Sequence, residues 1–179
     1  MTDTKTEKER NWYALYTKPR HEFKAATQLG SIGLEFFLPT ITTLKQWSDR
    51  KKKIVEPLLH SYIFLLGDEK ERLMALEQNA IVKTVSFNGV PAIVPKWQIE
   101  SLQKVLVENS NLFVSNTLVT GTRVKIINGP FNGAEGIIKN LSNNERTLSV
   151  NLDLLKRSVT VHLPLESVIK AVNQDIPDD

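Results

Sequence analysis

The hydrophobic positions of the first hundred residues switch between the two-residue period of strands and the longer period of helices. Residues 12–17, rich in aromatics and followed by Pro19, predict a strand and then the first turn of a helix. Further elements are predicted as strands over 35–44, 58–66 and 82–94 and as helices over 68–80 and from Pro95 onward. The order β-α-β-β-α-β-α predicts an α/β sandwich, in which helices cover an antiparallel sheet.

The pattern changes after a polar stretch without periodicity, which we interpret as a linker over residues 110–117. Beyond it, β-branched runs predict a small five-stranded barrel over 118–172. Leu148, Leu152 and Leu155 also have helical spacing, so a helical alternative for that segment stays open. We therefore expect an α+β protein. An N-terminal domain over residues 11–109 precedes the linker and the barrel, and the termini at 1–10 and 173–179 are expected to be flexible.

One segment of the second half, residues 121–138, carries turn and anchor residues in a specific order. Val124 and Ile126 alternate with charged residues, so one face of this strand is expected to be buried. In the turn that follows, Pro130 fixes φ, Gly129 and Gly133 can adopt positive φ, and Phe131 can anchor the turn in an apolar core. Gly136 lies in the next predicted strand, where a glycine usually marks a bulge or a bend. The segment resembles a KOW motif, found in proteins that travel with RNA polymerase or sit in the ribosome. An ordinary hairpin of a small barrel is the alternative.

The composition excludes several classes of function. The chain has no cysteine, so it forms no disulfide and no Cys-ligated zinc site, and its three histidines lack metal-ligand spacing. It has no Gly-x-Ser-x-Gly elbow and no phosphate loop. We therefore expect no enzymatic activity, no metal and no cofactor. No apolar run approaches the roughly 18 residues of a membrane span, and the polar start does not look like a secretory signal, so we expect a cytoplasmic protein.

Two further stretches carry a family resemblance. Trp12-Tyr-Ala-Leu-Tyr16 and the strand from Glu56 to Phe64, together with the KOW-like segment, resemble the NusG family of transcription elongation factors over most of the chain. The resemblance implies an N-terminal NGN domain followed by a KOW barrel. Pro91-Ala-Ile-Val-Pro95 is similar to the specialised RfaH branch. The stretch from Gln46 to Lys53, followed by Glu56-Pro57, resembles UpxY antiterminators of capsular polysaccharide operons.

The resemblance also implies a binding site for the clamp helices of the largest polymerase subunit. Tyr62 and Phe64 match the family's aromatic pair, and the two-residue period places both on one face of their strand. Leu58, Leu59 and Tyr16 are expected to line the same apolar depression. The alternative is that these side chains are core residues covered by helices, because residues 58–66 are apolar on both faces.

Basic residues predict contacts with nucleic acid. The net charge is only +3, but five cations gather within nine residues: Lys45, Arg50, Lys51, Lys52 and Lys53. They could neutralise phosphates while Trp47 stacks on a base or packs at the root of the tip. The RfaH resemblance implies a second contact, with non-template DNA, through Lys18 and less directly through Arg20 and His21. A solvated loop is the alternative in both places. The RfaH branch reaches the opposite polymerase jaw through a His-Thr-Thr run that residues 72–76 lack, so a direct contact with that jaw either does not carry over or uses other residues.

The loop formed by Leu154, Leu155, Lys156 and Arg157 matches the one that family members use for a second partner, in general NusG factors the Rho terminator or a small-subunit ribosomal protein. Leucines packed within the barrel are the alternative. We expect a monomeric, specialised elongation and antitermination factor that binds the polymerase clamp and suppresses pausing or termination. A general NusG-type elongation factor and a ribosome-associated RNA-binding KOW protein are the alternatives.

Overall fold

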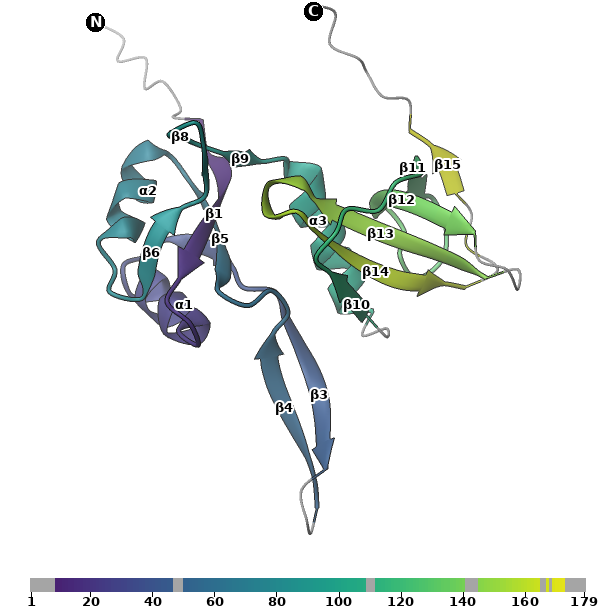
Figure 1. Ribbon diagram of the computed structural model, residues 1–179, viewed down its shortest axis with the longest axis horizontal. Helices are drawn as coiled ribbons and strands as arrows, with labels where there is room; N and C mark the ends of the chain where they lie inside the picture. Colours follow the sequence, from purple (N-terminus) through teal and green to yellow (C-terminus); the bar gives the residue numbers. More distant parts are fainter. Residues whose placement is uncertain are drawn as a thin grey trace, which may run out of the picture. The chain divides into compact units, whose positions relative to one another are not determined.

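The computed structural model describes residues 9–46, 50–108, 112–140, 145–164, 167 and 169–172. Contacts between Cα atoms group the chain into two compact units (Figure 1). The first unit joins residues 1–38 to residues 59–94, and the second joins residues 39–58 to residues 95–179. The sequence-based boundary at residue 109 differs from this grouping, because two segments before it cluster with the C-terminal part of the chain.

The first unit is built on an antiparallel sheet with the strand order β2-β5-β1-β6, and β9 also pairs with β1. Its strands are β1 (Asn11–Thr17), β2 (Glu35–Phe37), β5 (Tyr62–Gly67), β6 (Ile81–Thr84) and β9 (Ile93–Val94). This confirms the predicted antiparallel sheet and places β1 and β5, the two strands with the family resemblance, next to each other at its centre.

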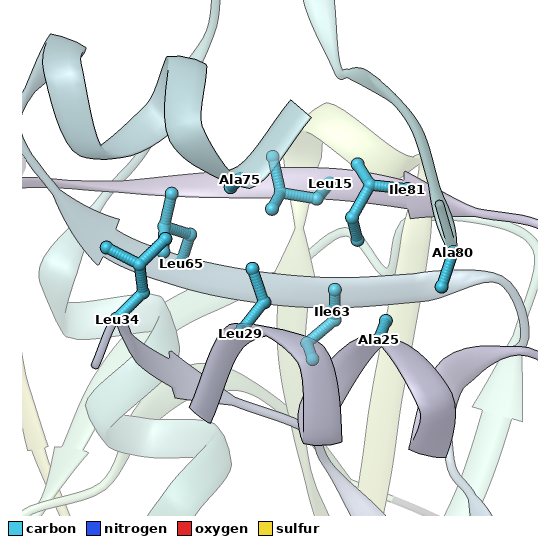
Figure 2. Close-up of a cluster of buried hydrophobic side chains, with 9 residues drawn as sticks. All are labelled: Leu15, Ala25, Leu29, Leu34, Ile63, Leu65, Ala75, Ala80 and Ile81. Carbon is cyan, nitrogen blue, oxygen red and sulfur yellow. The ribbon is translucent and has the colours of Figure 1, made fainter. Parts of the chain in front are cut away.

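Helices α1 (Glu22–Ser31) and α2 (Glu69–Leu76) cover one face of this sheet. Figure 2 shows the buried side chains that join them, drawn from β1, β5, β6, both helices and the adjoining turns: Leu15, Ala25, Leu29, Leu34, Ile63, Leu65, Ala75, Ala80 and Ile81. Burying one aliphatic side chain of this kind contributes about 1.5–3 kcal/mol. The cluster therefore fixes which face of β1 and β5 points toward the helices.

Several predicted boundaries shift for local reasons. Helix α2 is capped by Asp68, as predicted: the Asp68 carboxylate accepts a hydrogen bond from the Glu71 N–H, and the Glu71 side chain accepts one from the Asp68 N–H. The helix ends at Leu76 rather than near Ala80. The predicted strand 35–44 is divided at Pro39, which cannot donate to a ladder. The predicted strand 58–66 begins only at Tyr62, because Ser61 has a positive φ of 65°.

The predicted strand 82–94 is also divided. Strands β7 (Ser86–Phe87) and β8 (Val90–Pro91) form a short hairpin between β6 and β9. Asn88 and Gly89 have φ values of 49° and 80°, as expected for the predicted Asn-Gly turn. A second and longer hairpin belongs to the other unit, where β3 (Thr40–Gln46) pairs with β4 (Lys51–Pro57) along its whole length.

The C-terminal sheet has six antiparallel strands in the order β10-β14-β13-β12-β11-β15. They are β10 (Leu112–Ser115), β11 (Thr122–Ile126), β12 (Glu135–Asn140), β13 (Arg146–Leu152), β14 (Arg157–Leu163) and β15 (Ile169–Ala171). The extra strand β10 lies within the predicted linker, because Leu112-Phe-Val114 is apolar and pairs with β14. Over the residues that the structure describes, no pairing joins β10 to β15, so the predicted closed five-stranded barrel is not found.

The glycine-rich segment folds largely as its pattern predicted. Val124 and Ile126 are buried on β11, and Phe131 is only 1% exposed. Gly129 and Gly133 have positive φ values of 91° and 80°. The helical alternative for the following segment is wrong for Leu148 and Leu152, which lie buried in β13, while Leu155 ends the short 3₁₀ helix η1 (Asp153–Leu155).

Candidate functional site

The aromatic site lies on the sheet face opposite the helices of the first unit. On β5, Ile63 and Leu65 belong to the helix-covered cluster, so Tyr62 and Phe64 point to the other face. Tyr62 stands opposite Tyr16 in the β1–β5 register, and their rings meet edge to face with 5.4 Å between centroids. This confirms that Tyr62 and Phe64 share a face and brings Tyr16 to the same place.

The members of this aromatic site differ in accessibility. Tyr16 and Tyr62 are half-buried, whereas Phe64 is fully buried and stacks on Phe37 of β2 at a centroid distance of 6.1 Å. Leu59 is also buried, and its carbonyl accepts the Tyr62 N–H at 3.3 Å. Leu58 is buried at the base of the β3–β4 hairpin, which belongs to the second unit, with its N–H bonded to the Pro39 carbonyl. In this conformation the two tyrosines therefore form the accessible part of the aromatic site.

The turn after β1 carries the second predicted group. Lys18 and Arg20 are exposed and His21 is half-buried. The Lys18 ammonium donates to Asn79 Oδ1 at 3.2 Å, and the His21 Nδ1 lies 2.8 Å from the carbonyl of Pro19. Arg20 has a positive φ of 60° and directs the chain into α1. The turn is thus ordered by its own contacts and presents cations two and four residues beyond Tyr16.

Two polar residues beside this turn were not predicted from the sequence. Asn79 holds the Lys18 ammonium, and exposed Lys83 of β6 stands opposite Tyr16 in the β1–β6 register. Nothing local in the sequence relates either residue to β1, because both contacts span more than sixty residues. Lys83 extends the cationic rim of the aromatic site to a third strand.

The third predicted group lies on the β3–β4 hairpin. Lys45 forms an ion pair with Glu56, whereas Arg50, Lys51, Lys52 and Lys53 are exposed. Among the described residues, the structure records no carboxylate partner for those four cations. Trp47 lies outside the described residues. The hairpin therefore keeps most of the predicted positive charge accessible, although Lys45 is paired with Glu56.

The predicted partner loop of the C-terminal sheet is partly ordered by its own backbone. Leu154 and Leu155 belong to η1 and are half-buried, and exposed Lys156 adopts a left-handed φ of 52° that leads into β14. The Arg157 guanidinium donates to Asn116 Oδ1 at 2.6 Å. Of the four predicted residues, Lys156 thus carries the most accessible charge.

Helix α3 (Lys96–Val107) packs on β12 and β13 of the C-terminal sheet, an association that the sequence did not predict. Polar contacts fix it at both ends. The Gln98 amide donates to Asp153 Oδ2 at 2.5 Å, and the Lys104 ammonium donates to the Gly133 carbonyl at 2.9 Å. The Arg123 guanidinium lies 3.9 Å from the centre of the Trp97 ring, within the range of a cation–π contact.

One charged pair is partly withdrawn from water in the first unit. The guanidinium of Arg72 donates twice to Glu69, at 2.8 and 2.5 Å, and once to Thr84 Oγ1 at 3.0 Å. Hydrogen bonding to Arg72 lowers the pKa of Glu69, and the same bonds raise the pKa of Arg72. Through Arg72 the pair ties α2 to β6.

The described residues hold no group of three or more histidine, aspartate or glutamate side chains placed to bind a metal ion. Within the same part of the chain, no helix is long and apolar enough to cross a membrane. The candidate site therefore consists of two accessible tyrosines beside cations in one unit and a basic hairpin in the other.

These features define a mixed α/β protein with an aromatic sheet face and basic turns. Residues 10–103 match the family described as "Transcription termination factor nusG". The chain therefore belongs to the NusG family of transcription factors.

Solved structures resemble the chain at low identity. The structure entitled "Domain interaction in Thermotoga maritima NusG" is 19% identical, with a TM-score of 0.48, and the match covers 92% of this chain and 98% of that one. The MjSpt4:Spt5 complex in conformation A is 16% identical with a TM-score of 0.30, covering 90% and 97%. Its conformation B is 18% identical with a TM-score of 0.31, covering 91% and 97%.

Proposed function

We propose that this protein is a specialised NusG-family elongation and antitermination factor that binds the clamp helices of RNA polymerase and suppresses pausing or termination. The observation that carries the proposal is the aromatic site: Tyr16 and Tyr62 are in contact, half-exposed, and lie on the sheet face opposite α1 and α2. Amphipathic rings of this kind are good anchors at the centre of an interface, where removal of one often costs about 2 kcal/mol or more.

The proposed mechanism is mechanical rather than catalytic. The N-terminal domain favours the closed clamp by binding it better than the open one, which shifts the polymerase away from paused conformations. Lys18 and the basic hairpin contact exposed nucleic acid and orient the factor. The C-terminal sheet acts as the KOW domain, recruiting a second factor through the loop around Lys156, with tethering raising the effective concentration. The protein works in the cytoplasm as a monomer, at capsular polysaccharide operons.

Co-purification with RNA polymerase tests the proposal. We compare the wild type with Tyr62→Ala and with Phe23→Ala, which removes a 47% exposed ring from α1 on the helix-covered side of the same sheet. Phe64 is unsuitable because it is fully buried and its truncation would destabilise the sheet. Tyr62→Ala is expected to weaken polymerase binding about 30-fold, and Phe23→Ala to leave it near the wild-type level.

Equal polymerase recovery from the wild type and Tyr62→Ala would contradict the aromatic contact. Recovery of ribosomal RNA without polymerase would favour the ribosome-associated alternative. Transcript mapping after deletion separates a specialised role from a general one, because a specialised factor changes few operons and a general elongation factor changes many.

A further inference from the structure

The β3–β4 hairpin has two faces of different character, because residues opposite each other in an antiparallel pair share a face. One face, here called the paired face, carries Ile41, Thr43, Lys45, Lys52, Ile54 and Glu56. The other, here called the open face, carries Thr42, Leu44, Gln46, Lys51, Lys53 and Val55. The cations of the hairpin are therefore distributed over both sides of a two-stranded ribbon.

The paired face neutralises part of its own charge. Glu56 forms the ion pair with Lys45 and also accepts a hydrogen bond from the Thr43 hydroxyl at 3.2 Å. This face therefore carries two lysines and one carboxylate, and that carboxylate already contacts Lys45 and Thr43. A polyanion that approached this side would meet the negative charge of Glu56 beside Lys45.

Within the part of the hairpin that the structure describes, the open face carries cations with no recorded carboxylate partner and apolar side chains that are largely exposed. Lys51 and Lys53 are exposed on it, about 7 Å apart along one strand. Leu44, directly opposite Lys53, is 65% exposed, and Val55 is 52% exposed. Exposed lysines next to exposed aliphatic side chains form a surface that is both cationic and apolar.

We propose, building on the nucleic-acid contact in the proposed function, that the open face of the hairpin binds single-stranded nucleic acid. Lys51 and Lys53 neutralise neighbouring phosphates, and Leu44 and Val55 contact the faces of unpaired bases. A duplex keeps its base faces inside the stack, whereas a single strand exposes them to apolar contacts. Charge and apolar surface together therefore favour an unpaired strand over a duplex.

The test is binding of a fluorescent single-stranded oligonucleotide to the full chain, measured by anisotropy between 50 and 200 mM salt. Two variants remove the same number of positive charges from opposite faces: Lys51→Ala/Lys53→Ala on the open face and Lys45→Ala/Lys52→Ala on the paired face. Loss of two phosphate contacts lowers the log–log salt slope by about 1.4, so the wild type should lose about sevenfold more affinity over this range than the open-face variant. The paired-face variant should change the slope by less than half as much.

A third variant, Leu44→Ala/Val55→Ala, separates base contact from charge. It is expected to weaken binding of the single strand, to leave the salt slope unchanged, and to leave binding of a duplex of the same sequence unaffected. Equal slope changes for the two lysine variants would overturn the proposal, as would an equal effect of the apolar variant on single strand and duplex. Binding of polyglutamate but not of the oligonucleotide would also overturn it, in favour of an acidic protein surface.

Matched thermal unfolding of all variants controls for folding, and the altered side chains are mostly exposed. The oligonucleotide measurement contains no polymerase. If the oligonucleotide does not bind, the polymerase contact proposed for Tyr62 is unaffected. If Tyr62 does not contact polymerase, the oligonucleotide result is unchanged.

Discussion

The ring of Tyr16 on β1 meets the ring of Tyr62 on β5 at an interplanar angle of 71°, with 5.4 Å between their centroids. This edge-to-face arrangement joins residues 46 positions apart in the sequence and forms the accessible part of the aromatic site. Such ring pairs contribute about 0.5–1.5 kcal/mol beyond the area that they bury. The two tyrosines therefore stabilise the sheet while their rings stay partly exposed.

A double-mutant cycle measures that contribution. Tyr16→Leu and Tyr62→Leu, alone and together, keep apolar bulk at each position while removing the ring pair. We expect a coupling free energy of about 0.5–1.5 kcal/mol in urea unfolding, because each single variant already loses the edge-to-face contact. Additive losses, with no coupling beyond experimental error, would show that the rings do not stabilise each other.

The faces of β1 and β5 could be predicted from the sequence, whereas the cover over them could not. A two-residue period assigns Tyr62 and Phe64 to one side of a strand, but it contains nothing about what packs on that side. Phe64 thus proved fully buried while Tyr62 remained accessible. The helix cap at Asp68 was predictable because all of its partners lie within one turn.

Contacts between distant segments account for most of the remaining differences. The three apolar residues of β10, Leu112-Phe-Val114, were too few to stand out from the polar stretch around them, and pairing with β14 decided their structure. The pairing of Lys45 with Glu56 depends on the register of the hairpin, which composition does not give. For the same reason, packing of α3 on the C-terminal sheet had no local signal.

Phe131 is expected to be a main anchor of the C-terminal sheet. Its ring is 1% exposed within the glycine-rich turn. Phe131→Ala should lower the free energy of unfolding by about 3–5 kcal/mol, because a large buried ring leaves a cavity. Phe113→Ala, which truncates a 57% exposed ring on β10, is the control and should cost less than about 1.5 kcal/mol. Similar losses from both variants in denaturant unfolding would argue against an anchoring role.

Gly136 is expected to be required for the pairing of β12 with β13. The sequence suggested a bend at this position, but the structure shows a close approach: a Cβ added here would lie 2.6 Å from the Ser149 carbonyl oxygen. Since that oxygen belongs to the neighbouring backbone, Gly136→Ala should force the strands apart and cost about 1–3 kcal/mol.

The same substitution at Gly30 provides the control for Gly136. A Cβ at Gly30 would meet only the Phe36 ring at 3.6 Å, an ordinary contact, within helix α1. Gly30→Ala should therefore be neutral or stabilise by up to about 1 kcal/mol, since alanine favours helix. Thermal unfolding of both variants checks the pair, and a stable Gly136→Ala protein would contradict the steric argument.

The bidentate contact between Arg72 and Glu69 should make stability depend on acidity. The pKa of Glu69 is lowered in the folded state, chiefly by hydrogen bonding to Arg72, so its stabilising effect is present above its ordinary value near 4.5. That effect is lost as the pH falls from about 4.5 through the lower folded value. Arg72 stays charged throughout this range, since its pKa is raised.

In urea unfolding at pH 3 to 6, Glu69→Gln should lose less stability on acidification than the wild type. Glu77→Gln, at the exposed end of the same helix, should keep the wild-type slope. Parallel curves for the wild type and Glu69→Gln would show that this carboxylate does not couple folding to pH.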